Sequence, residues 1–454
     1  MFYYIIKRVF YFIPTFFLIS LIIFFLSKAA GEHLNCMNAP NGPDYEVCKD
    51  EAQQKGYDKP IFYFTLSTAA HPGTLYQVFR EERRDALYKL ISQYGNWPQI
   101  QRYNQLVQEV DVAIEAIGEG KINSNITTVK KAIQVLYVAY KDPVISSQLA
   151  KIETAIQDSL LINFKPTALA LFDAYSQIKQ EATPNKLLIP KINGYGWDNQ
   201  YHYWITNFLK GNFGISHRDS LPVADKIMAR LPWTLYINIP AIFLAYLLSI
   251  PLGVYSAIHQ GSRFDNFVSG SLLLLYSLPV FWIGTLLVNF LTTPEYGMKI
   301  FPSIGLNGDS LTWDNITRLF LPVFCITYGA LAFMTRQMRS SMLDTLQQDF
   351  IRTARAKGLS EKTVIWKHAF RNSLFPMITI FGSVLPFAFA GSIIIEFIFN
   401  ITGMGWLMLD SIQSKDWPVV YAILMIAAVL TMIGLLIADI LYVFADPRVQ
   451  LGKK

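Results

Sequence analysis

The chain has 454 residues, of which 52% are hydrophobic and only 16% are charged, and its mean hydropathy is +0.29. This composition is typical of a membrane protein and argues against an ordinary soluble domain. Residues 29–230 hold 21 basic and 21 acidic residues, so the remainder holds 39 − 21 = 18 basic and 33 − 21 = 12 acidic residues. The +6 excess therefore lies in the apolar part and its short loops, which indicates membrane topology and argues against a nucleic-acid partner.

Six runs without a charge are long enough to cross a bilayer, which takes about 20 helical residues. They are 9–27, 233–258, 267–293, 319–335, 374–395 and 417–438. The first run resembles a signal peptide in its flanks, Lys7-Arg8 and "SKA", but its 19 residues exceed a signal core of about 7–15. We interpret it as a retained anchor. Prolines within the runs indicate either kinked helices that line a pathway able to open, or packing irregularities without a gating role. They are Pro14, Pro240, Pro251, Pro279, Pro322 and Pro386.

The segment between the first two runs contains a helical region. Residues 71–183 show apolar residues at helical spacing, first in "TLYQVFREERRDALYKLISQYG" and then at about 98–118, 126–141, 143–163 and 166–181. Pro98, Pro143 and Pro166 stand where helices begin. Residues 184–220 are rich in Asn, Gly, Tyr and Trp, a composition that predicts a loop. We predict a small helical domain there.

Two cysteines stand near the start of this segment, in "CMNAPNGPDYEVC". Cys36 and Cys48 form a disulfide if they face an oxidising compartment, or remain free thiols. A zinc site is less favoured because no second Cys/His pair stands nearby.

Basic residues in the short loops predict the orientation. With the N-terminus inside, the cytoplasmic pieces would be 1–8, 259–266, 336–373 and 439–454, with fourteen Lys and Arg against three in the short outer loops. Positive residues remain on the cytoplasmic side, so both termini are expected there, with residues 28–232 outside.

The cytoplasmic stretch "IRTARAKGLSEKTVIWKHAFRNSLFP" (351–376) predicts two helices and a corner. Residues 342–357 read as one helix with an apolar stripe of Leu346, Phe350 and Ala354. Gly358 suits a left-handed helix end, and Ser360 with Glu361 suits the start of the next helix, whose stripe is Trp366, Phe370 and Leu374. Such a hairpin fits either a groove in a partner or an anionic lipid surface.

This stretch resembles the EAA-type coupling loop of permease subunits in ATP-binding-cassette importers, most closely the dipeptide/oligopeptide/nickel branch. Further motifs fit in order: "GNFGIS" (211–216), "LPVADKIMARLPWTL" (221–235), "IPLGVYSA" (250–257), "SLPVFWIG" (277–284), "EFIFNITGMGWLMLDSI" (396–412) and "ADILYVFADPRV" (438–449). The chain departs from the general motif, because Arg352, Thr353 and Ala354 replace Glu-Ala-Ala, and the insert around 60–185 exceeds what this branch carries. The resemblance covers the first run and nearly everything from about 195 onward.

The apolar runs and the helical periodicity predict an all-α integral membrane protein with six transmembrane helices and a helical extracytoplasmic insert between the first and second. The resemblance implies a permease subunit of the bacterial inner membrane. We expect an anchor helix (1–28), an extracytoplasmic region (29–194, insert about 71–183) and a five-helix core (195–454) with the coupling loop (336–373). Implied partners are a second permease, two cytoplasmic ATP-binding subunits and an extracytoplasmic substrate-binding protein, and the implied cargo is peptides, with nickel complexes second. A non-transporting scaffold is the alternative. The implied coupling residues are Asp349, Arg352, Thr353, Ala354, Arg355, Ala356, Lys357, Gly358, Leu359 and Ser360.

The sequence points to no catalytic, metal or cofactor site of its own. No G-x-x-x-x-G-K-[S/T] occurs, so ATP hydrolysis by that route is assigned to partner subunits. Glu396 and Asp410 border a short outer loop, where solvation is the simpler expectation, and Asp439 is expected to pair locally near the inner face.

Overall fold

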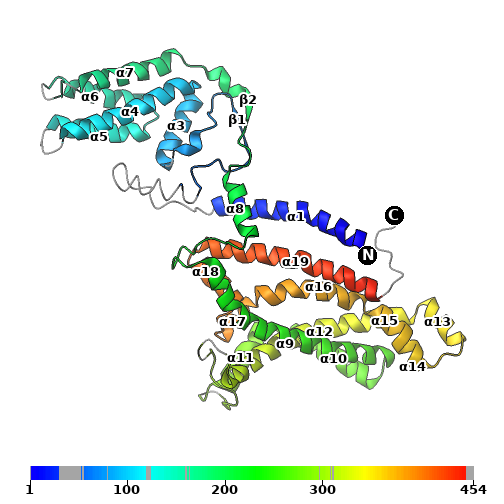
Figure 1. Ribbon diagram of the computed structural model, residues 1–454. Helices are drawn as coiled ribbons and strands as arrows, with labels where there is room; N and C mark the ends of the chain where they lie inside the picture. The colour runs from blue at the N-terminus through cyan, green and yellow to red at the C-terminus, as the bar shows by residue number, and fades with distance from the viewer. Residues whose placement is uncertain are drawn as a thin grey trace. The chain divides into compact units, whose positions relative to one another are not determined.

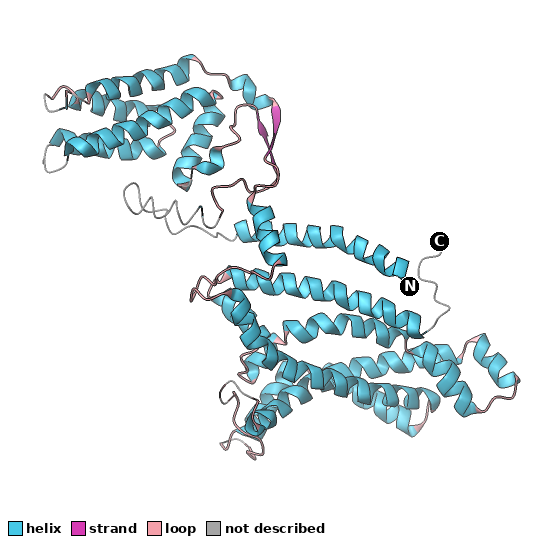
Figure 2. Cartoon of the chain, in the orientation of Figure 1, coloured by secondary structure: helices cyan, strands magenta, loops and turns pink. Residues whose placement is uncertain are grey.

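The computed structural model describes residues 2–29, 53, 56–78, 80–118, 124–158, 161–162, 164–295, 297–306, 308 and 311–445 (Figure 1). Cys36 and Cys48 lie outside these residues. The chain divides into two compact units, one of residues 1–31 with 207–454 and one of residues 32–206. Helices dominate both, and the described residues hold a single two-stranded sheet, which confirms the prediction of an all-α integral membrane protein (Figure 2).

Five helical spans of the first unit are long and apolar enough to cross a membrane. They are Ile6–Ala29 in α1 (Phe2–Ala29), α9 (Val223–Ile258), α12 (Trp313–Leu346), Phe375–Ile398 in α16 (Phe375–Ala390) and α17 (Ile393–Ile398), and Trp417–Tyr442 in α19 (Trp417–Ala445). They match five of the six runs that hydropathy predicted. Internal prolines do not interrupt α1, α9, α12 or α16, as membrane helices allow.

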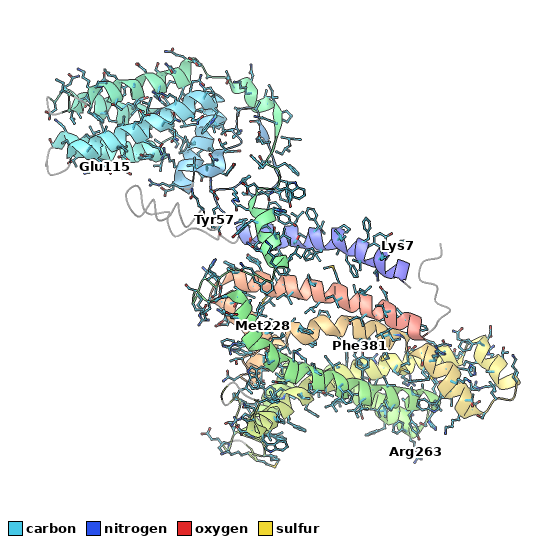
Figure 3. The ribbon with its side chains drawn as sticks, viewed as in Figure 1. Lys7, Tyr57, Glu115, Met228, Arg263 and Phe381 are labelled. Atoms are coloured by element: carbon cyan, nitrogen blue, oxygen red, sulfur yellow. The ribbon has the colours of Figure 1, made fainter. Side chains whose placement is uncertain are left out.

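The predicted run at 267–293 is not one straight helix. It forms α10 (Arg263–Ser277, its first residue labelled in Figure 3) and α11 (Val280–Thr292), which meet at 88°. Leu278 is extended at the break because the ring of Pro279 disfavours helical backbone in the residue before it. The unit therefore has five spans among its described residues, or six if the bent pair counts as one.

Close contacts between distant segments hold these helices side by side. α9 packs on α12, and α19 packs on both α16 and α1. A Cβ added at Gly382 would lie 2.8 Å from the carbonyl oxygen of Gly434, so only glycine permits the approach of α16 and α19. The Tyr246 hydroxyl of α9 donates to the Met377 carbonyl, 3.0 Å, and its ring lies 5.9 Å from that of Phe381 (labelled in Figure 3).

The second unit is a bundle of five amphipathic helices, as the periodicity predicts. They are α3 (Glu81–Tyr94), α4 (Trp97–Gly118), α5 (Ser124–Val138), α6 (Asp142–Ala155) and α7 (Lys165–Gln180). Pro143 and Pro166 lie in the first turns of α6 and α7, as expected. One continuous cluster of buried side chains, including Ile91, Val110 and Ile133, forms the core.

Residues 184–220 are not the loop that their composition predicts. They contain a 3-10 turn, η4 (Pro184–Leu188), the strand β2 (Pro190–Gly194) and helix α8 (Gln200–Leu209). β2 pairs antiparallel with β1 (Phe64–Thr68), a partner about 125 residues earlier, with Leu66 opposite Ile192. Strand pairing over that distance leaves no local signal in the sequence. A further 3-10 turn, η2 (Leu75–Gln77), precedes the bundle.

Candidate functional site: the loop between α12 and α16

The segment between α12 and α16 folds as two short helical arms. The first is α13 (Asp349–Ala356), and the second combines α14 (Glu361–Thr363), the π-helical turn η5 (Val364–Ala369) and α15 (Phe370–Ser373). The prediction of one helix over 342–357 is wrong, because α12 ends at Leu346 and Gln348 is extended before α13 begins. The break leaves α13 as a separate eight-residue arm.

The corner between the arms has the predicted local chemistry. Gly358 has a φ of +76°, in the left-handed region that favours glycine. The Ser360 hydroxyl accepts from the Thr363 amide, 3.4 Å, and Glu361 lies in the first turn of the second arm. The Arg355 guanidinium reaches across the corner to Glu361, with Nε 2.8 Å from Oε1. Glycine conformation, cap and ion pair therefore define the angle between the arms.

A different stripe from the predicted one anchors the arms. Ile351 and Ala354 of α13 are buried, together with Val364 and Ala369 of η5, whereas Phe350 is 43% exposed. The break after Leu346 shifts the helical phase, so Ile351 takes the inner position instead of Phe350. The second stripe is also altered: Trp366 is 52% exposed, while Phe370 and Leu374 are partly buried.

The buried residues of both arms belong to one cluster with the membrane helices. It includes Met334, Met338 and Met342 of α12 and Ala245, Val254 and Ala257 of α9. The Ser341 hydroxyl of α12 also donates to the carbonyl of Ser373, 3.0 Å. Close-packed interiors transmit strain, so a displacement of the two arms would be passed on to α12 and α9.

Nine of the ten predicted coupling residues lie on the outer side of this loop, and only Ala354 is buried. Arg352 is 3.7 Å from Asp349, and both side chains are largely exposed. Phe350 and Leu359, 43% and 41% exposed, add apolar surface beside the charges. An apolar surface rimmed by charges is the usual composition of a protein-binding site.

A buried ion pair beside this loop was not predicted from the sequence. Arg339 of α12 donates two hydrogen bonds to Asp265 of α10, both 2.7 Å, and Asp265 is 2% exposed. Asp265 also accepts from Ser256 and from the amide of Gly261, 2.9 Å. The Ser262-x-x-Asp265 spacing is a capping-box pattern, which could have predicted that a helix begins here. It could not have predicted that Asp265 pairs with Arg339.

Glu396 is not solvated as expected, because it is 1% exposed. Its carboxylate accepts from the Thr234 hydroxyl of α9, 3.0 Å, and from the amide of Trp406, 2.9 Å, in the first turn of α18 (Met404–Gln413). Amides at a helix N-terminus donate readily to a carboxyl oxygen, which explains how this polar side chain is held in the interior. Gly391 and Gly403 leave the space it fills, since a Cβ at either would lie within 2.7 Å of a Glu396 oxygen.

The other two acidic residues also have partners. Asp410 pairs with Arg218, and 28% of its side chain remains exposed to solvent. Asp439 of α19 accepts from Arg8 of α1, 2.6 Å, which ties the first span to the last and corrects the expectation of a local partner.

One more cluster joins the loop before α9 to the α18–α19 corner. Asp416, 1% exposed, accepts from the Ser216 hydroxyl, 2.5 Å, from the amide of His217, 2.9 Å, and from Lys226, 3.2 Å. Lys226 also donates to Asp219, 2.8 Å, and this bond lowers the pKa of Asp219 to about 2. Within the described residues, no group of three His, Cys, Asp or Glu side chains could hold a metal ion.

Comparison of the sequence with known proteins shows the family of this chain. The family described as "binding-protein-dependent transport system inner membrane component" matches residues 249–451, which include the two-arm loop. The oligopeptide transport system permease protein AppB of Bacillus subtilis (strain 168) is 43% identical over 255 residues, 55% of this chain and 80% of that protein. The dipeptide transport system permease proteins DppB of Lactococcus lactis (MG1363) and Escherichia coli (K12) are 37% and 34% identical, over 87% and 80% of their lengths. The chain therefore belongs to the family of inner-membrane permease subunits of binding-protein-dependent ATP-binding-cassette importers.

Proposed function

We propose that this permease carries peptides across the bacterial inner membrane by alternating access. The similar oligopeptide and dipeptide permeases support peptide cargo. Nickel complexes, which the family resemblance also implies, are the second candidate. Uptake of labelled di- and oligopeptides and of nickel, with and without this chain in its host, tests the assignment. Peptide uptake that depends on the chain supports it, and dependence of nickel uptake alone would replace it.

The anchored loop is the observation that carries the mechanism. Its outer side exposes charged residues together with Phe350 and Leu359, which a partner could contact. Its inner residues pack in one buried cluster with residues of α12 and α9. Two ATP-binding subunits would bind the outer sides of this loop and of its counterpart in a second permease. When ATP closes those subunits, the arms transmit the movement to α12 and α9, and the pathway opens to the side where a substrate-binding protein delivers cargo. A scaffold that does not transport would not require the loop to pack against α12 and α9.

The proposed orientation places both termini and the loop in the cytoplasm and the second unit outside. It rests on the fourteen basic residues of the inner loops against three of the short outer loops. A disulfide between Cys36 and Cys48 stays a prediction that depends on this orientation. The second unit would adjust docking of the binding protein and perform no chemistry.

Charge reversal on the outer side of the loop should weaken capture of the ATP-binding subunits. Arg352→Glu with Lys357→Glu removes two exposed charges, each worth up to about 1 kcal/mol, so pull-down affinity should fall by up to about thirtyfold. Arg102→Glu on α4, with 56% of its side chain exposed, is the matched control and should have no effect. Full capture combined with weaker binding to anionic vesicles would instead assign the loop to lipid.

Removal of the helical bundle should leave the membrane unit intact. The amide of Ala69 donates to the carbonyl of Ile189, 2.8 Å, so an Asn-Gly turn can join these residues in place of 70–188 and close β1 and β2 as a hairpin. We expect normal membrane insertion and normal assembly with ATP-binding subunits, and weaker association with the binding protein. Loss of assembly would show that the bundle is needed to build the pore.

A further inference from the structure

An arginine near the start of α9 lies against α18. Arg230 follows Ile227 by three residues and precedes Thr234 by four, so the three side chains share one face of the helix. That face contacts α18, because Ile227 packs in one cluster with Met404 and the Met404 amide donates to the Thr234 hydroxyl, 2.6 Å. The guanidinium of Arg230 lies over the Trp406 ring of α18, 5.9 Å from its centre. Arg230 is therefore held where the two helices meet.

The charged groups beside Arg230 have their own partners, and Arg230 has none. Lys226, one turn earlier on α9, pairs with Asp219 and Asp416. Glu396 is 1% exposed, and hydrogen bonds from α9 and α18 occupy its carboxyl oxygens. Within the part of the chain that the structure describes, the Arg230 guanidinium has no hydrogen-bond acceptor and no carboxylate within 4 Å. An arginine stays charged and offers five N–H donors, so this position favours an anion from outside the unit.

Arg230 is restrained and can still be reached by a solute. It is partly exposed and stands three residues before the uncharged run 233–258, where a long side chain can reach water. The contact with the Trp406 ring restrains the planar guanidinium and uses none of its hydrogen-bond donors. A planar fork of N–H donors matches the two oxygens of a carboxylate better than a single-point cation does.

The helix that carries Arg230 also carries residues packed against the coupling loop. Farther along α9, Val254 and Ala257 lie in one buried cluster with Ile351 of α13. A displacement of the arms would be passed along α9 and would change the position of Arg230 relative to α18. A ligand bound to Arg230 would therefore be held by an element that moves in the proposed transport cycle.

We propose that Arg230 binds the C-terminal carboxylate of a peptide as the peptide passes between α9 and α18. Linear peptides differ in their side chains and share this carboxylate, so one fixed cation recognises the whole class. A peptide with an amidated C-terminus would lose the contact. The inference rests on the proposed function, because it requires a peptide cargo.

Uptake of labelled trialanine in two forms, with a free C-terminus and with a C-terminal amide, tests this role. Arg230→Gln should lower uptake of the free form about tenfold, because charge-assisted hydrogen bonds are lost, and lower uptake of the amide by no more than about twofold. Arg230→Lys keeps the charge but not the fork, so its uptake of the free form should be intermediate. Lys210→Gln removes an exposed cation of the same unit, and this matched control should change neither rate.

The ratio of the two uptake rates separates Arg230 from the binding protein, whose own preference contributes the same factor in every variant. An equal loss of both forms in Arg230→Gln would overturn the proposal, because the arginine would then serve folding, docking or lipid binding. Unchanged uptake of the free form would also overturn it. A different result, in which uptake of neither form depends on the wild-type chain, would reject the proposed peptide cargo itself.

A binding measurement makes the test independent of uptake rates. The full chain is labelled with fluorotryptophan in lipid nanodiscs, and the fluorine resonance of Trp406 is identified by its loss in Trp406→Phe. Trialanine should shift this resonance, because the carboxylate draws the guanidinium from the ring, and trialanine amide should not. Arg230→Gln should abolish the shift. The absence of a shift, a shift with both peptides or a shift that persists in Arg230→Gln would contradict the proposal.

Discussion

Replacing Gly358 by valine is expected to abolish uptake while the protein still reaches the membrane. Its φ of +76° costs a residue with a side chain about 1–2 kcal/mol, and a β-branched residue is the least tolerated there. No atom lies within 4 Å of the position where the new Cβ would stand, so the strain is in the backbone alone. The corner would relax by rotating one arm against the other, and the docking surface would no longer fit the ATP-binding subunits.

Gly358→Asn is the matched control, because asparagine adopts the left-handed region more readily than other residues with a side chain. Membrane abundance, capture of the ATP-binding subunits and peptide uptake should be measured for both variants. The asparagine variant should retain most of the uptake, and the valine variant should lose both capture and uptake. Normal uptake by Gly358→Val would refute the role of the corner in coupling.

Replacing Arg339 by methionine is expected to lower the free energy of unfolding by about 3–5 kcal/mol, because it leaves Asp265 buried without its cation. Asp265 is 2% exposed and would keep the hydrogen bonds from Ser256, Gly261 and Ser269, none of which comes from a cation. Because α10 and α12 would separate beside the loop, uptake should fall as well. Thermal unfolding of the purified protein in detergent measures the stability.

Two further variants identify the cause of that loss. Arg336→Met on the same helix removes a guanidinium that lies over the Tyr276 ring, 5.6 Å from its centre, and should cost about 1 kcal/mol or less. Arg339→Met combined with Asp265→Leu should recover much of the stability, since a buried pair replaced by apolar residues is often tolerated. If the double variant is as unstable as Arg339→Met alone, lost packing and not the orphaned carboxylate is the reason.

Features that depend on neighbours along the chain could be predicted from the sequence. Apolar runs revealed five spans, helical periodicity revealed the five helices of the bundle, and Gly358 with Ser360 revealed the corner of the loop, since each is specified within a few residues. The family resemblance added the coupling role of the loop, which stays a proposal. The bend between α10 and α11 also had a local cause, Pro279, but a continuous apolar run concealed it.

Features that depend on distant partners were decided only by the tertiary structure. Glu396 can be buried because the Thr234 hydroxyl, 162 residues earlier, and the Trp406 amide of α18 donate hydrogen bonds to its carboxyl oxygens. Asp265 can be buried because Arg339, 74 residues later, neutralises its charge. The break after Leu346 turns Ile351, and not Phe350, to the inner side of α13, where Ile351 packs in one buried cluster with Met334, Met338 and Met342 of α12. The energy of a buried charge or of a packed side chain depends on the groups that surround it in space, and sequence spacing carries no record of those groups.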